Sequence, residues 1–286
     1  MINIGELADL HVGSMFGLWP ENFASSTRGV FELNIGQKYL LENWNRIAKQ
    51  IPPLDLLILN GDIIDGVQRK SEGLYICEPN MQFQMFAAME LLEPFLRRVR
   101  RGGEIYSTEG TTYHEGTGSK WCNQLAKDID AVPMADNQYC WDWLLLDVQG
   151  KHFDIAHHQS HAIVYKSSIQ EREMNYAEMQ KSHADILIRS HNHVYSWLEI
   201  PREDRVQFFL STPPWQLQSH YVRKSYSPNM KLTSQLGMIV VTIDKRGEMD
   251  KKRFLFPHPP MRRGEYVKAR LQHERTVPAV AKGKPS

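Results

Sequence analysis

The order of apolar and polar positions along the chain predicts strands separated by helices in the first half. Residues 2–7 alternate between apolar and polar, which is typical of a half-buried strand. Residues 54–59, Leu-Asp-Leu-Leu-Ile-Leu, form a nearly continuous apolar run, which is typical of a strand covered on both faces. Shorter apolar runs at 105–107 and 186–188 predict two further strands.

Helical spacing separates these strands. Residues 36–50 place their apolar side chains on one face, as expected of a helix that packs on a core. Residues 83–100 are rich in Met, Phe and Leu and predict a second helix, with a kink at Pro94. Further helices are expected at residues 119–128 and 167–182.

The second half of the chain is mostly strand. Alternating segments separated by turn residues are expected at 141–147, 151–156, 196–200, 205–210, 237–244 and 252–256. Early strands that alternate with helices, followed by consecutive strands, predict an α/β fold of two packed sheets with helices outside, in one domain. We expect this domain to span residues 1–258 and a basic, flexible tail to span residues 259–286.

Charge is balanced overall but concentrated at the end of the chain. The net charge of +1 over 286 residues gives no support for a protein that coats nucleic acid. From residue 258 onward there are seven basic and two acidic residues. This tail would either hold nucleic acid through its phosphates or form a disordered end. No apolar run approaches the ~20 residues of a membrane helix, so no membrane partner is expected.

The cysteines and the first residues bear on the compartment. Cys77, Cys122 and Cys140 are three in number and form no C-x-x-C motif. We expect buried or free thiols in a reducing compartment, with at least one cysteine unpaired. The first residues already predict a strand, which leaves no room for a signal peptide. The expected location is therefore the cytoplasm.

Short clusters of acidic and histidine residues follow the predicted strands. In chain order they are Asp9-x-His11, Gly61-Asp62-x-x-Asp65, His114-Glu115, His157-His158 and His191-x-His193. Sites in layered α/β folds form beyond the carboxyl ends of strands, so these side chains are expected to converge. Carboxylate and imidazole groups suit Mn²⁺, Fe and Zn²⁺. Two such ions close together form a clamp for displacement at phosphorus.

Each cluster also has a plainer interpretation. Asp62 is either a carboxylate that bridges two ions or a turn or helix cap. Asp65 is expected to orient a ligand rather than to bind metal itself. His114 is either a proton donor to a leaving oxygen or a polar loop residue. Of the adjacent histidines, His157 is expected to point inward as a ligand and His158 outward. The presence of all the clusters in one chain favours the functional interpretation.

The motifs resemble those of the calcineurin-like metallophosphoesterases, whose pattern is D-x-H, G-D-x-x-D, G-N-H-D/E, H and G-H-x-H. The resemblance runs from about residue 5 to residue 195. Residues 212–215, Thr-Pro-Pro-Trp, and the strands after them look like compact members from phages and prophages. The resemblance implies a four-layer α-β-β-α sandwich of two mixed sheets that hydrolyses phosphate esters.

The resemblance also implies a site with two divalent metal ions. Mn²⁺ is expected, with Fe, Zn²⁺ or Ni²⁺ as alternatives. One ion would be held by Asp9, His11, Asp62 and His193. The other would be held by Asp62, His157 and His191, so that Asp62 bridges the two. A hydroxide between the metals would attack phosphorus in line, and His114 would serve as general acid or phosphate contact.

Two departures from the family pattern stand out. The Asn ligand of the third motif is missing, and Thr111, Thr112 or water would take its place. A hydroxyl is a weaker ligand than an amide carbonyl, so the second ion is expected to bind loosely. Ser190 stands where the pattern has a glycine before His191, which is expected to be tolerated.

Residues near the predicted ligands have two interpretations. The aromatic ones would either stack on a nucleobase or close long loops over the core, and they are Phe16, Trp19, Tyr113, Trp215 and Tyr221. The polar ones would either contact phosphate or lie solvated at the surface, and they are Lys120, His161 and Arg189.

The leading hypothesis is a hydrolase of phosphate esters that uses two metal ions. A phosphodiester, either a nucleotide or a nucleic acid, is favoured over a monoester as the substrate. The altered third motif motivates a second hypothesis, a module that binds metal and a partner without turnover. A protein phosphatase is a third. The sequence does not indicate an oligomeric state.

Overall fold

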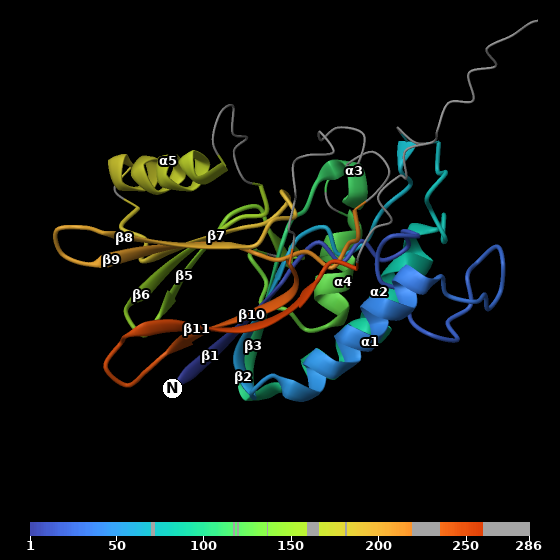
Figure 1. Ribbon diagram of the computed structural model, residues 1–286, viewed down its shortest axis with the longest axis horizontal. Helices are drawn as coiled ribbons and strands as arrows, with labels where there is room; N and C mark the ends of the chain where they lie inside the picture. Colours follow the sequence, from blue (N-terminus) through green and yellow to red (C-terminus); the bar gives the residue numbers. More distant parts are fainter. Residues whose placement is uncertain are drawn as a thin grey trace, which may run out of the picture.

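The computed structural model describes residues 1–69, 72–116, 118, 120–135, 137–158, 166–180, 182–218 and 235–259. Two mixed sheets lie face to face between outer helices (Figure 1). The prediction of an α/β fold with two mixed sheets and flanking helices is confirmed. Three positions or segments with predicted roles lie outside the described residues, namely His161, Tyr221 and the tail from residue 260.

The first sheet has the strand order β11-β10-β1-β2-β3-β4. Its strands are β1 (Ile2–Leu7), β2 (Leu54–Asn60), β3 (Val99–Thr108), β4 (Cys140–Trp141), β10 (Gln235–Ile243) and β11 (Met249–Pro257). Neighbours from β1 to β4 are parallel, whereas β10 and β11 pair antiparallel. Loops after β1, β2 and β3 therefore leave the same edge of the sheet.

The second sheet has the strand order β5-β6-β7-β9-β8. Its strands are β5 (Leu144–Val148), β6 (Lys151–Ile155), β7 (Ile186–Arg189), β8 (Ser196–Pro201) and β9 (Val206–Ser211). The three central strands are parallel, and β5 and β8 are antiparallel edges. Loops after β6 and β7 therefore also leave one common edge.

Helices cover the outer faces of both sheets (Figure 1). The first sheet is covered by α1 (Ile35–Gln50), α2 (Met81–Leu96) and α4 (Lys120–Asp128), and the second by α5 (Lys166–Met179). Asn34 begins α1 with a capping box, since its side chain accepts from the Gln37 N–H. Trp44 of α1 packs edge-on against Trp215, with ring centroids 4.7 Å apart. This contact holds the segment after β9 against the helices.

A continuous apolar core holds the two sheets together. Ile4, Ile58 and Tyr106 from the first sheet meet Phe153 and Ile188 from the second, and all five are buried. Full burial of one large apolar side chain contributes about 1.5–3 kcal/mol. The core therefore fixes the two sets of strand ends relative to each other.

The boundary between α2 and β3 differs from the prediction. A helix was expected over 83–100, but α2 ends at Leu96 and β3 begins at Val99. The first half of β3 is largely exposed, so it lacks the apolar alternation that marks a strand. Pairing with β2, from Leu54↔Val99 to Leu56↔Glu104, determines its conformation instead.

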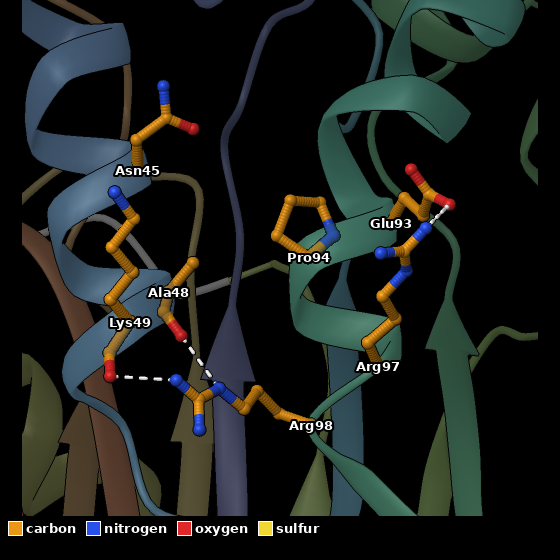
Figure 2. Close-up of a pocket in the computed structure, with 7 residues that line it drawn as sticks. All are labelled: Asn45, Ala48, Lys49, Glu93, Pro94, Arg97 and Arg98. Atoms are coloured by element: carbon orange, nitrogen blue, oxygen red, sulfur yellow. Dashed lines mark hydrogen bonds and ion pairs between the residues drawn. The ribbon is translucent and has the colours of Figure 1, made fainter.

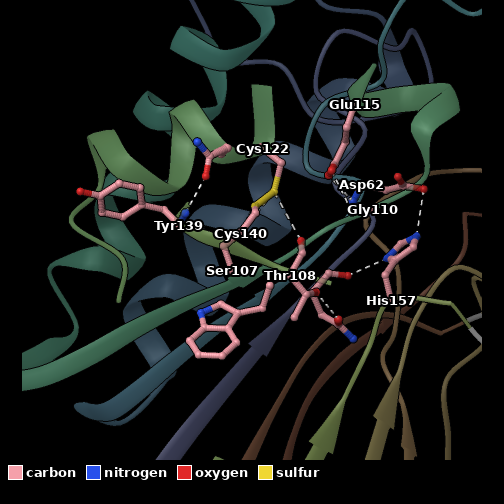
Figure 3. The surroundings of a disulfide bond; sticks show 12 residues. Asp62, Ser107, Thr108, Gly110, Glu115, Cys122, Tyr139, Cys140 and His157 are labelled. Atoms are coloured by element: carbon pink, nitrogen blue, oxygen red, sulfur yellow. Dashed lines mark hydrogen bonds and ion pairs between the residues drawn. A yellow bond between two sulfur atoms is a disulfide. The ribbon is translucent and has the colours of Figure 1, made fainter. Parts of the chain in front are cut away.

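The cysteines also differ from the prediction. Cys122 of α4 and Cys140 of β4 form a disulfide, with their Cα atoms 6.3 Å apart (Figure 3). The expectation of free thiols was therefore wrong for these two residues. Cys77 is unpaired and buried, in agreement with the odd count. None of the helices in the described part of the chain has the length and apolar character needed to cross a bilayer.

Candidate metal centre

Main-chain hydrogen bonds bring the loops after β1 and β2 together. The Asp9 N–H donates to the Gly61 carbonyl and the His11 N–H to the Asp62 carbonyl, both at 3.1 Å. The first sheet thus presents Asp9, His11 and Asp62 side by side. The second sheet contributes three histidines opposite them, His157 after β6 and His191 and His193 after β7.

Several of these residues have a left-handed backbone, which residues other than glycine rarely adopt. The φ angle lies between 47° and 68° at Asp9, His11, Asp62, His191 and His193. Each such residue costs on the order of 1–3 kcal/mol, and it persists only where its surroundings fix it. Concentration of this strain in one group of polar residues points to a functional site.

The structure gathers the predicted side chains into three overlapping groups whose ligand atoms lie within 4.8 Å of one another. The groups are Asp9, His11 and His193; His11, Asp62 and His114; and Asp62, His157 and His191. Every predicted metal ligand belongs to at least one of them. His11 and Asp62 each belong to two of them, and of these two only the carboxylate of Asp62 has two oxygens with which to bridge two ions.

Distances inside the groups are those of side chains that converge on a common point. The Nε2 atoms of His11 and His193 are 3.1 Å apart, and the latter lies 3.3 Å from Asp9 Oδ1. His157 Nε2 lies 3.1 Å from Asp62 Oδ2. These atoms belong to loops of both sheets, so a bound cation would join the two halves of the molecule.

Two polar atoms at the centre are buried and make ion-pair contacts but no well-aligned hydrogen bond among the described residues. They are Asp9 Oδ1 and His157 Nε2. An unsatisfied buried polar group costs about 1–3 kcal/mol. A divalent cation would coordinate both atoms, so the residues fit a metal site.

Hydrogen bonds on the far side of the histidines set their orientation. His157 Nδ1 lies 2.7 Å from the Asn60 carbonyl, and His114 Nδ1 lies 2.7 Å from the Asp65 carbonyl. A carbonyl oxygen only accepts, so both Nδ1 atoms carry hydrogen and both Nε2 atoms face the site. The Asp65 carboxylate lies 3.1 Å from His11 Nδ1. Asp65 thus contacts two histidines of the site and lies behind them, where an orienting residue would lie.

Burial and neighbouring charges shift the pKa values in the site. Burial lowers the pKa of His11 well below its usual value, and burial with nearby His157 lowers the pKa of His191 to about 4. Both rings are therefore uncharged at neutral pH. Burial alone would lower the pKa of His157, but the charges of Asp62 and Asp9 raise it to about 10. The two carboxylates thus attract a positive charge at this point.

Glu115 was predicted only as part of the His114-Glu115 cluster, without a role of its own, and the structure places it directly behind Asp62 (Figure 3). Its carboxylate accepts the N–H groups of Asp62, at 3.0 Å, and of Gly110, at 2.8 Å. Burial and the nearby Asp62 charge raise the pKa of Glu115 to about 8. Only its place next to His114 in the chain distinguishes it in the sequence. Glu115 holds the β2 and β3 loops together.

Thr111 and Thr112, the predicted substitutes for the missing Asn ligand, differ in burial. Thr111 is buried, and both its N–H and its hydroxyl donate to Asp62 Oδ1, at 2.7 and 3.0 Å. Thr112 is exposed. Thr111 is therefore the threonine that reaches the site, where it holds the carboxylate of Asp62.

Most of the residues considered for substrate contact lie elsewhere. Trp19 and Trp215 are fully buried in the core beneath the helices. Arg189 is buried between Asp154 and Glu173, with ion pairs of 2.8 and 3.0 Å, so it does not face a substrate.

The three other residues considered for substrate contact lie at different places in the structure. Phe16 packs against the same core and against the ring of Tyr75. Lys120 is exposed and lies over the ring of Trp121. Half-buried Tyr113 packs edge-on against His114, with ring centroids 4.9 Å apart. In the described part of the chain, the ring of Tyr113 contacts a residue of the metal-ligand groups, and the Trp215 N–H donates to the Asp9 carbonyl at 3.0 Å.

A cavity of about 400 Å³ lies apart from this centre, between the C-terminal turns of α1 and α2 (Figure 2). Arg98 crosses it and donates to the carbonyls of Ala48 and Lys49, at 2.8 and 2.7 Å. It thereby satisfies the last carbonyls of α1. None of the predicted ligands lines this cavity.

Comparison with known proteins gives distant similarities only. No protein-family model and no curated protein matches the sequence. Among solved structures, a novel archaeal phosphodiesterase is 11% identical, with 89% of this chain and 100% of that chain covered and a TM-score of 0.43. Vps29 from Entamoeba histolytica complexed with Zn²⁺ is 13% identical, with 90% and 99% covered and a TM-score of 0.42. A predicted phosphoesterase from Streptococcus pneumoniae is 12% identical, with 90% and 97% covered and a TM-score of 0.33. These similarities are too distant to assign the chain to a family.

Proposed function

We propose that this chain is a hydrolase of phosphate esters that works with two divalent metal ions. The observation that supports this most strongly is that Asp62 belongs to two groups of potential ligands at once. One ion would be held by Asp9, His11, Asp62 and His193, and the other by Asp62, His157 and His191. When bound, such a pair supplies a hydroxide at neutral pH and withdraws charge from the phosphoryl oxygens.

His114 is the proposed proton donor to the leaving oxygen. The Asp65 carbonyl holds its Nδ1–H, and the side chain is 17% exposed, so it reaches solvent at the edge of the site. Its ring packs at 82° against that of His11, with centroids 4.5 Å apart. A group held in this way places a proton beside the reacting phosphoryl group without itself becoming buried.

The finer details of the proposal concern the metal and the substrate. Mn²⁺ is the proposed ion, because carboxylates and imidazoles make up the ligands and no thiolate is among them. The proposed substrate is a phosphodiester, a nucleotide or nucleic acid, with half-buried Tyr113 beside His114 as the nearest aromatic surface. Kinship with compact phage members is a further proposal that rests on residues 212–215.

A metal-binding module without turnover is the second candidate. The observation in its favour is that the Thr111 hydroxyl, expected in place of the missing Asn ligand, donates to the carboxylate of Asp62. An ion with few protein ligands binds more weakly. A metal site of this kind is compatible with a scaffold as well as with an enzyme.

Hydrolysis of two generic esters tests the proposal. The protein is treated with a chelator, Mn²⁺ is returned, and cleavage of bis-p-nitrophenyl phosphate and p-nitrophenyl phosphate is followed. We expect turnover that depends on Mn²⁺, is faster on the diester and is abolished in Asp62→Ala. His114→Ala should lower the rate by about 10²–10⁴-fold while Mn²⁺ remains bound. Bound Mn²⁺ without cleavage of either ester would favour the scaffold.

A further inference from the structure

Asn60, the last residue of β2, forms a buried polar bridge between the two sheets. Its Oδ1 accepts the hydroxyl of Thr108 at the end of β3, at 2.6 Å. Its Nδ2 donates to the hydroxyl of Ser190 after β7, at 2.8 Å, and to the carbonyl of Ala156 after β6, at 3.3 Å. The bridge therefore starts on the first sheet and ends on the second.

The bridge is fully buried, and its hydrogen bonds determine the orientation of the Asn60 amide. Asn60, Thr108 and Ser190 all have no exposed surface. The carbonyl of Ala156 only accepts, which fixes the Asn60 amide with its nitrogen toward the second sheet. Each polar group has a partner, so loss of one hydroxyl would leave one hydrogen-bonding position of the buried amide unfilled, at a cost of about 1–3 kcal/mol.

Asn60 and Ser190 also form a closed ring of hydrogen bonds with His157. His157 Nδ1 donates to the Asn60 carbonyl at 2.7 Å, and the Ser190 N–H donates to the His157 carbonyl at 2.9 Å. Ser190 directly precedes His191, and Asn60 lies two residues before Asp62. All three members of one ligand group are therefore within two residues of this ring or part of it.

We propose that the Thr108–Asn60–Ser190 bridge positions the ligands of one metal ion, the one held by Asp62, His157 and His191. The inference rests on the proposed two-metal site and assigns it further residues that touch neither metal nor substrate. The serine in place of a glycine before His191 supplies the hydroxyl that closes the bridge. The other ligand group, Asp9, His11 and His193, has no hydrogen bond to Asn60 or Thr108 among the described residues.

Calorimetric titration of the metal-free protein with Mn²⁺ tests this role. Ser190→Ala and Thr108→Val each remove one hydroxyl of the bridge with little change in volume. We expect the weaker of the two binding steps to lose about 10–100-fold in affinity, as when a residue that orients a metal ligand is lost. The stronger step should be unchanged. Thr108→Ser, which keeps the hydroxyl, should titrate like the wild type.

A matched control and a second readout separate positioning from general stability. Ser182→Ala removes a serine hydroxyl that has no hydrogen-bond partner among the described residues, and it should leave both steps unchanged. Thermal unfolding of each metal-free variant reports stability separately. A lower Tm with both steps intact, or equal weakening of both steps, would overturn the positioning role. If Thr108→Val does not fold, Ser190→Ala decides alone. A wild type that binds fewer than two ions would instead refute the proposed function itself.

Discussion

Glu6 of β1 makes the stability of this protein depend on pH in an unusual direction. It has no exposed surface, and neither carboxylate oxygen has a hydrogen-bond partner among the described residues. Its strand neighbours are Ile58 of β2 and Ile239 of β10, both in the core between the sheets. Burial raises the pKa of Glu6 well above its usual value. The folded protein therefore keeps this group protonated where the unfolded chain ionises it.

The sign and size of the effect follow from the difference in bound protons. Below the pKa of glutamate in the unfolded chain, ~4.3, the carboxyl group is neutral in both states and does not make the free energy of unfolding depend on pH. Above it, the folded state holds one proton more, so the free energy of unfolding falls by about 1.4 kcal/mol per pH unit. The fall continues until the pH reaches the raised pKa of the folded state. Glu6→Gln removes this term, because an amide does not ionise.

Urea unfolding at pH 5, 6 and 7 in the presence of a chelator measures the free energy of unfolding of the wild type and of Glu6→Gln. Relative to the wild type, Glu6→Gln should become more stable with each step in pH. Glu42→Gln on the exposed face of α1 is the control, and its difference from the wild type should stay constant. Parallel curves for wild type and Glu6→Gln would refute the reasoning, since Glu6 would then have an ordinary pKa or a partner.

Three further predictions concern the surroundings of the centre. Replacing Cys122 and Cys140 by serine should lower the free energy of unfolding by about 3 kcal/mol, from the loop entropy of an 18-residue separation, and unfolding in urea measures this. No change would mean that the bond does not form in solution. Asp65→Asn should lower the rate of ester cleavage about 10–100-fold, because His11 loses the carboxylate that orients its Nδ1; a wild-type rate would contradict this assigned contact. Gly61→Ala should abolish Mn²⁺ binding in calorimetry, because the new Cβ would lie 2.5 Å from His157 Nδ1 at a φ of +74°. Wild-type affinity would contradict the close packing of these loops.

The sequence predicted the strands that carry the site because their signal is local. The apolar run before Asp62 and the shorter run before His191 each end at a ligand, and hydrophobic periodicity needs no knowledge of distant residues. The inward His157 and outward His158 follow from the same alternation, and the structure buries the first and exposes the second. The two-sheet fold followed from the order of these elements.

Contacts between distant segments could not be predicted in this way. Glu115 binds Asp62 across 53 residues, and Asn60 binds Ser190 across 130, yet neither residue type is unusual at its place in the chain. The disulfide joins an α-helix to a two-residue strand, and spacing alone does not determine which cysteines meet. Pairing with β2, rather than its own pattern, determines the start of β3.

The position of bound metal tests the central claim most directly. Crystals grown with Mn²⁺ are measured by anomalous diffraction at the manganese edge. Two peaks are expected on either side of the Asp62 carboxylate, one against Asp9, His11 and His193 and the other against His157 and His191. A single peak, or peaks away from Asp62, would contradict a two-metal centre in this protein.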